Sequence, residues 1–122
     1  MDWTKDQLIE IAAADGLRIS PFREDGTTYG TPTFIWSVVV GDGLYVRPYN
    51  GSSSRWYKAA MREGAGRISV AGQVYDVDFA PADAALNDVI DAAYQAKYAK
   101  SAYLAPMISA RTRAASVRIT LR

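Results

Sequence analysis

The most regular feature of the chain is an apolar run that reverses direction at a glycine-containing turn. Residues 34–40 and 44–46 are rich in β-branched and aromatic side chains, and Gly41-Asp42-Gly43 separates the two runs. Such side chains favour strands, and a short turn with glycine favours a tight hairpin. The pattern predicts two adjacent antiparallel strands.

A second pair of segments alternates apolar and polar residues with a period of two. Residues 67–70 and 74–79 flank the turn Ala71-Gly72-Gln73, and the alternation places Asp76 and Asp78 on the solvent side. One apolar and one polar face are typical of antiparallel strands that cover a core from one side. Two further segments predict strands: 17–20 and 115–122.

Three segments carry apolar residues at helical spacing. Thr4 and Gln7 have the spacing of a capping box, in which each side chain accepts a hydrogen bond from the other residue's backbone N–H. Gly16 and Gly64 follow two of the periodic segments, as expected at helix ends. The predicted helices are Lys5–Ala14, Ser52–Glu63 and a segment that opens at Pro81-Ala82-Asp83 and reaches about Lys100.

The order of these elements predicts the fold class. Hairpins joined through short helices, with five or six strands in 122 residues, indicate an α+β fold built on a small antiparallel barrel or a highly curved sheet. The sequence contains no internal repeat, linker or low-complexity segment. We therefore expect residues 1–122 to form a single domain.

Composition excludes several kinds of chemistry. The chain has no cysteine and no histidine, so it forms no disulfide, thiolate nucleophile, imidazole base or Cys/His zinc site. A histidine-dependent serine hydrolase is excluded as well. No pair of carboxylates has a spacing that indicates acid/base catalysis or an oxygen-only metal site. The residues alone therefore indicate no catalytic side chain and no metal.

Charge and hydropathy restrict the kinds of partner, nucleic acid or membrane, that the protein can bind. Fourteen Lys and Arg residues balance 13 Asp and Glu residues, and the net charge of +1 does not favour nonspecific nucleic-acid binding. The first residues lack a basic segment followed by an apolar run, and no segment approaches the length of a membrane span. Absence of cysteine fits a reducing compartment. We expect a cytoplasmic protein that binds neither membranes nor nucleic acid.

The segment 47–57 is the most informative for function. It leads from a strand through a turn to a predicted helix N-terminus, where free backbone N–H groups and the helix dipole favour an anion. Arginine side chains bracket the segment, and a guanidinium binds phosphate through two parallel hydrogen bonds. The candidate phosphate or carboxylate ligands are Arg47, Asn50, Ser52, Ser53, Ser54 and Arg55.

Several features follow one another in a recognisable order: the loop Gly26 to Thr33, Phe34-Ile35-Trp36, Gly41-Asp42-Gly43, Leu44-Tyr45-Val46, Asn50-Gly51 and Trp56-Tyr57. This order resembles the FMN-binding split barrel group, and within it the deazaflavin-dependent nitroreductase branch. The chain is also similar, nearly from end to end, to a small family of uncharacterised bacterial proteins of unknown function. The residues that carry this second resemblance are Leu44-Tyr45-Val46-Arg47, Asn50-Gly51 and Ala92-Ala93-Tyr94-Gln95-Ala96-Lys97-Tyr98.

The resemblance implies a split β-barrel with flanking helices, forming a homodimer with a pocket at the subunit interface. It implies a flavin or deazaflavin cofactor (FMN, FAD or F420) that carries hydride to an unknown small molecule, so that histidine and cysteine are not needed. The loop Tyr49 to Ser54 would hold the phosphate, and Trp36, Tyr49 and Trp56 would border the ring. The loop that is basic in the nitroreductase branch here contains Arg23 together with Glu24 and Asp25.

Each candidate residue also has a purely structural interpretation. The arginines suit surface charges, the serines suit a helix N-cap, and Asn50-Gly51 suits a turn. Trp36 and Trp56 suit a core or a dimer interface. The alternative to the oxidoreductase is accordingly a noncatalytic module that binds a small ligand or a protein partner on the same scaffold.

Overall fold

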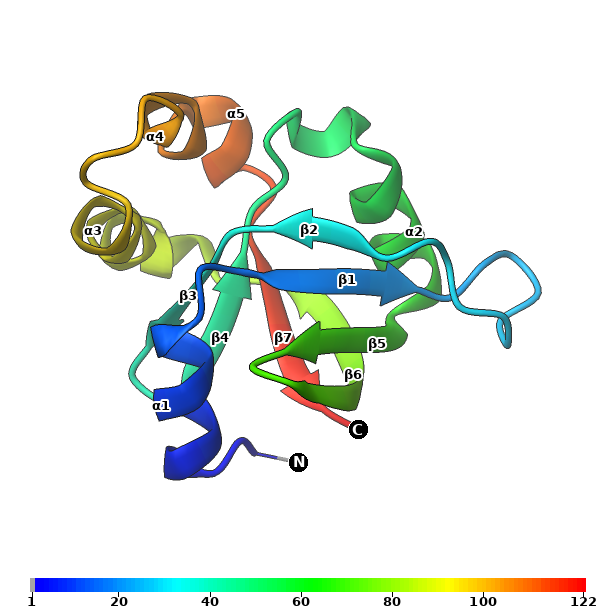
Figure 1. Ribbon diagram of the computed structural model, residues 1–122. Helices are drawn as coiled ribbons and strands as arrows, with labels where there is room; N and C mark the ends of the chain where they lie inside the picture. The colour runs from blue at the N-terminus through cyan, green and yellow to red at the C-terminus, as the bar shows by residue number, and fades with distance from the viewer. Residues whose placement is uncertain (1) are drawn as a thin grey trace.

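The computed structural model describes residues 2–122, and its strands form one antiparallel sheet (Figure 1). The strands are β1 (Leu17–Pro21), β2 (Thr33–Ile35), β3 (Ser37–Val40), β4 (Gly43–Val46), β5 (Ala65–Val70), β6 (Gln73–Pro81) and β7 (Val117–Leu121). Their order in the sheet is β2-β1-β5-β6-β7-β4-β3. Both predicted hairpins are confirmed, β3–β4 in the register Val38↔Tyr45 and β5–β6 in the register Ile68↔Tyr75.

The sheet curls until its two ends nearly meet. β2 and β3 lie at opposite ends of the strand order, yet Trp36 alone separates them in the chain. Two Cα–Cα steps of about 3.8 Å join Ile35 to Ser37, so the two ends of the sheet lie within about 8 Å of each other at this point. The predicted α+β fold, a small antiparallel split barrel with flanking helices, is confirmed.

The same geometry corrects one detail of the prediction. The apolar run 34–40 is not one strand, because its two halves pair with different neighbours: β2 pairs with β1 in the register Leu17↔Ile35, and β3 pairs with β4. Trp36 lies at the break between them.

Helices cover the barrel on two sides. The helices are α1 (Lys5–Ala13), α2 (Arg55–Glu63), α3 (Asn87–Lys97), α4 (Leu104–Met107) and α5 (Ala110–Arg113), with 3-10 turns η1 (Gly51–Ser53) and η2 (Ala84–Leu86). The predicted capping box of α1 is present. The helix predicted over Ser52–Glu63 is instead η1 followed by α2, and the third predicted helix is divided into η2 and α3.

Figure 1 shows α3, α4 and α5 grouped on one side of the barrel and α2 on the other. No helix between residues 2 and 122 has the length and hydropathy to cross a membrane.

Apolar side chains form two clusters, one inside the barrel and one outside it. β4 contributes to both, because Leu44 and Val46 point into the barrel while Tyr45 packs against α3 and α4 on the outer face. All residues of β4 are therefore buried. The outer cluster consists of Val38, Tyr45, Ile90, Tyr94 and Met107.

One charged side chain, Arg47, is fully buried directly after β4. Its Nε donates to Ser116 Oγ at 2.8 Å, and its Nη1 donates to Asp91 Oδ1 at 2.5 Å and to the Met107 carbonyl at 3.1 Å. Its Nη2 donates to the carbonyl and side-chain oxygens of Asn87 at 3.2 and 3.3 Å. Because a guanidinium has five N–H groups, this set occupies its whole hydrogen-bonding capacity.

We predict that Arg47→Ala lowers the free energy of unfolding by roughly 3–5 kcal/mol, because Asp91 and two carbonyls then lose a buried donor. Urea unfolding measures the change. The matched control is Arg122→Ala, which removes a half-exposed ion pair with Asp78 at 3.8 Å and should cost less than about 1 kcal/mol. Equal stability of the two variants would contradict a structural role for Arg47.

Candidate functional site

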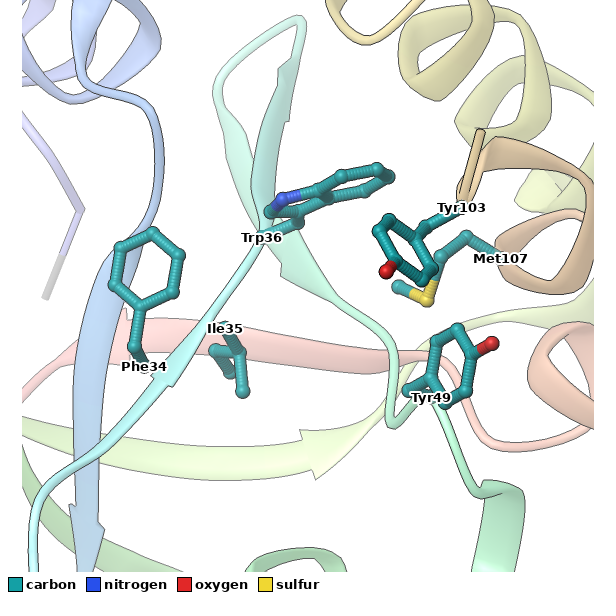
Figure 2. A pocket seen from close by; sticks show the side chains of 6 residues that line it. All are labelled: Phe34, Ile35, Trp36, Tyr49, Tyr103 and Met107. Atoms are coloured by element: carbon teal, nitrogen blue, oxygen red, sulfur yellow. The ribbon is translucent and has the colours of Figure 1, made fainter. Parts of the chain in front are cut away.

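A pocket of about 330 Å³ opens where β2 ends and the chain crosses to β3. We name it the aromatic pocket, and it is lined by Phe34, Ile35, Trp36, Tyr49, Tyr103 and Met107. Figure 2 shows Phe34 and Ile35 on one side of the opening and Tyr49, Tyr103 and Met107 on the other, with Trp36 above and between them. None of these side chains is charged at neutral pH, so the pocket favours a flat, uncharged ring.

Trp36 is held as a rigid wall of the aromatic pocket. Its indole stacks on the ring of Tyr98 with centroids 3.9 Å apart and planes within 3°. The Tyr98 hydroxyl donates to the Asp15 carbonyl at 2.5 Å and accepts from the Ser37 N–H at 3.2 Å. Burial raises the pKa of Tyr98 to about 12, so this hydroxyl stays protonated at neutral pH. The wall is thus fixed from behind before any ligand binds.

Lys97 supports the same backbone turn. Its Nζ donates to the Ser37 carbonyl at 2.8 Å, and the residue is partly buried. Burial lowers the pKa of Lys97 from its usual value. Lys97 therefore holds the start of β3, directly after Trp36.

The other aromatic walls keep large exposed faces. The exposed fraction is 53% for Phe34, 44% for Tyr49 and 64% for Tyr103. Tyr49 and Tyr103 meet edge to face with centroids 6.3 Å apart. These rings leave the pocket open to solvent and available to a ligand or a second protein surface.

The predicted polar loop lies next to the aromatic pocket, because Asn50 and η1 directly follow Tyr49. Asn50, Ser52 and Ser53 are exposed, and Ser53 Oγ donates to the Asn50 carbonyl at 2.9 Å. Ser54 is the N-cap residue of α2, but its side chain makes no capping hydrogen bond, and the first turn of α2 contains no acidic residue. The loop offers hydroxyl groups and free backbone N–H groups at one place on the surface.

A second, larger hollow of about 790 Å³ lies between α2 and the loop that follows β1. We name it the arginine groove. Arginine and acidic side chains mix along it, and Arg62 pairs with Glu63 at 2.7 Å and lies 4.0 Å from Glu24. Its lining residues are Pro21, Phe22, Arg23, Glu24, Asp25, Gly30, Thr31, Thr33, Arg55, Trp56, Ala59 and Arg62.

The Asp25 carboxylate accepts its hydrogen bonds from Thr27 and Thr28 of the loop that follows β1. Hydrogen bonds from the Thr28 side chain and backbone, and from the Thr27 backbone, lower the pKa of Asp25 from 3.8 to about 2. The carboxylate accepts from the Thr27 and Thr28 N–H groups at 2.9 and 2.8 Å. Asp25 thereby organises the loop that forms one side of the arginine groove.

The structure distributes the predicted site residues over four places. Trp36 and Tyr49 line the aromatic pocket, whereas Arg55 and Trp56 line the arginine groove. The polar loop beside the aromatic pocket contains Asn50, Ser52, Ser53 and Ser54. Arg47 lies in the interior with every N–H group bonded to the chain, so it has no donor for an external phosphate and we remove it from the candidate ligands.

Two pocket residues have no signal in the sequence. Tyr103 and Met107 come from the segment around Pro106, where short helices leave no apolar periodicity to read. Only their aromatic or thioether side chains, which suit a ring-binding wall, distinguish them.

The fold and the pocket together define a small antiparallel-barrel protein with a preformed aromatic pocket at the joint of its sheet. The chain belongs to the DUF2255 family, described as an uncharacterized protein conserved in bacteria, and the family model matches residues 7–119. The predicted similarity to an uncharacterised bacterial family is confirmed. No curated protein matches the sequence significantly.

We predict a pH-dependent loop. Because the folded-state pKa of Asp25 lies below its usual value of 3.8, its contribution to loop order is complete above that value and is lost as the pH falls through about 2. A nuclear magnetic resonance titration of the Asp25 side-chain carboxyl carbon measures the pKa. Thr28→Val should raise it toward 3.8, while Thr31→Val should leave it unchanged. A wild-type pKa at the usual value would contradict the assignment.

Proposed function

We propose that the aromatic pocket binds the ring of a flavin or deazaflavin cofactor, FMN or F420, and that the protein acts as an oxidoreductase on a small molecule. The observation that supports this proposal is the uncharged aromatic pocket of about 330 Å³ beside a loop of exposed hydroxyl groups. This volume lies at the lower end of small-molecule sites, which occupy about 300–1,000 Å³. It suits one ring system with its remaining groups outside.

The residues of the pocket fit such a ring in three respects. Trp36, fixed by Tyr98, offers a flat face for stacking, and Tyr49 and Tyr103 offer rings on one side of the opening. Met107 adds a thioether that adapts to an aromatic edge. Phe34 and Ile35 add apolar contacts from the side of β2.

The polar loop fits the acidic end of the cofactor. Ser52 presents an exposed hydroxyl group, while the Ser53 hydroxyl is already bonded to the Asn50 carbonyl, and the N-terminal turn of α2 presents backbone N–H groups. When bound, the cofactor supplies hydride chemistry, and the chain supplies binding, orientation and exclusion of water. This division of roles is compatible with a chain that has no histidine and no cysteine.

The proposal includes a homodimer that is located in the cytoplasm. The exposure of Phe34 and Tyr103 around the open pocket supports a second copy as its cover, because large exposed apolar patches mark interaction surfaces. The absence of cysteine supports a reducing compartment.

A noncatalytic small-ligand or partner-binding module is the second candidate. It is favoured by the arginine groove, where Glu24 and Asp25 lie among Arg23, Arg55 and Arg62, so that the groove is not purely basic. The two candidates differ in one property, because only the oxidoreductase binds a redox cofactor that is reduced and reoxidised on the protein.

We predict saturable micromolar binding of FMN or F420, with FAD as the third ligand tested. Cofactor fluorescence follows the titration, and a rise in melting temperature reports preferential binding to the folded chain. Trp36→Leu should weaken binding at least tenfold, or about 1.4 kcal/mol, because it removes the stacking face.

Trp56→Leu is the matched control, because Trp56 lines the arginine groove and its loss should leave the ring affinity unchanged. Melting curves establish that both variants fold. The proposal fails if none of the three cofactors binds, or if both tryptophan variants weaken binding equally.

A further inference from the structure

The arginine side chains of the described chain divide into two groups by their partners. Six form an ion pair with a carboxylate within 4.0 Å: Arg47, Arg62, Arg67, Arg113, Arg118 and Arg122. The other four, Arg18, Arg23, Arg55 and Arg111, form no ion pair with any residue between 2 and 122. Of these four, Arg111 lies at the edge of the aromatic pocket, where it contacts Tyr49. Its positive charge is therefore not offset by the chain itself.

Arg111 is held against one wall of the aromatic pocket. Its Nη2 donates to the Tyr49 carbonyl at 2.8 Å, and its guanidinium carbon lies 5.8 Å from the centroid of the Tyr49 ring. The residue is exposed, and within the described chain its other N–H groups have no acceptor. A guanidinium has five N–H groups, so a pair of parallel donors stays available for an oxyanion.

Gly51 permits this position of Arg111. A Cβ atom at Gly51 would lie 2.4 Å from Cγ and 3.1 Å from Cδ of Arg111, and Gly51 has φ +67°. The aliphatic stem of Arg111 thus packs directly on the Asn50-Gly51 turn, next to the exposed hydroxyls of η1. A glycine at this position serves the approach of the arginine as well as the turn.

From this geometry we infer that Arg111 binds the acidic group of the ligand whose ring occupies the aromatic pocket. The ligand class is a flat, uncharged aromatic ring that carries a phosphate, carboxylate or sulfonate group. The inference rests on the proposed function for the ring. It assigns to Arg111 the contact with the acidic group that the sequence predicted for Arg47, whose N–H groups are all bonded inside the protein. Arg55 lines the arginine groove instead and is not part of this contact.

The first experiment compares FMN with riboflavin, which has the same ring and no phosphate. We predict that the wild-type protein binds FMN at least tenfold more tightly, a preference of about 1.4 kcal/mol. Arg111→Met should remove most of this preference and leave riboflavin affinity within about twofold, since the phosphate then keeps only its contacts with the polar loop. Gly51→Ala should reduce the preference as well, because it displaces the arginine stem.

Arg122→Met is the control, since Arg122 pairs with Asp78 on the barrel and should leave the preference intact. Melting curves exclude unfolding of the variants. Retention of the preference in Arg111→Met, or equal binding of FMN and riboflavin by the wild type, overturns the inference.

A second probe pair separates failure of this inference from failure of the cofactor proposal. 1-Anilinonaphthalene-8-sulfonate and N-phenyl-1-naphthylamine share one ring system, and only the first carries an acidic group. If no flavin binds but the sulfonate is preferred at least about tenfold, and Arg111→Met alone removes this preference, the cofactor proposal fails and the role of Arg111 stands. Equal affinity for both dyes, or the same preference in Arg111→Met, overturns the role of Arg111.

Discussion

The fully buried guanidinium of Arg47 needs a hydrogen-bond acceptor for every N–H group, because transfer of an unpaired charge from water into the protein interior costs several kcal/mol. Arg47 meets this requirement with groups from three parts of the chain. Asn87 and Asp91 come from α3, the Met107 carbonyl comes from α4, and Ser116 precedes β7. The helices on this side of the barrel are consequently fixed relative to β4. Met107, whose side chain lines the aromatic pocket, is positioned through its own carbonyl.

The buried charge and the pocket wall are also joined by a stack of rings. The Arg47 guanidinium carbon lies 5.5 Å from the Tyr94 ring, Tyr94 lies 5.9 Å from Tyr98, and Tyr98 stacks on Trp36 at 3.9 Å. Both tyrosines pack from the last turns of the α3 segment, so one element supports the wall from behind. A wall that is fixed in the free protein loses little conformational entropy when a ring stacks on it. The pocket is thus preorganised by the same contacts that fix α3.

Local signals in the sequence were sufficient for the hairpins and the α1 capping box, because each depends on residues close together in the chain. The barrel class was predicted from the order of these elements. The break at Trp36 could not be predicted from local signals, because the division of the run 34–40 depends on pairing of its first half with β1 and of its second half with β4. Arg47 has the sequence context of a surface phosphate ligand, and only the partners at 87, 91, 107 and 116 reveal its burial. Four of the six residues that line the aromatic pocket were absent from the predicted site, because Phe34 and Ile35 were predicted only as strand residues and Tyr103 and Met107 follow no periodic pattern.

The separation of the predicted site into two hollows follows from the turn at Gly51. Tyr49 precedes the turn and joins the aromatic pocket, while Arg55 follows η1 and joins the arginine groove. The two hollows then differ in chemistry. Carboxylate and guanidinium groups both line the groove, which suits a ligand with both donors and acceptors, whereas the aromatic pocket contains no charge and suits an uncharged ring. An acidic substituent on such a ring is compatible with the uncharged pocket only if the substituent lies at the rim. Arg111 is bonded to Tyr49 at this rim, and solvent there screens the remaining charge.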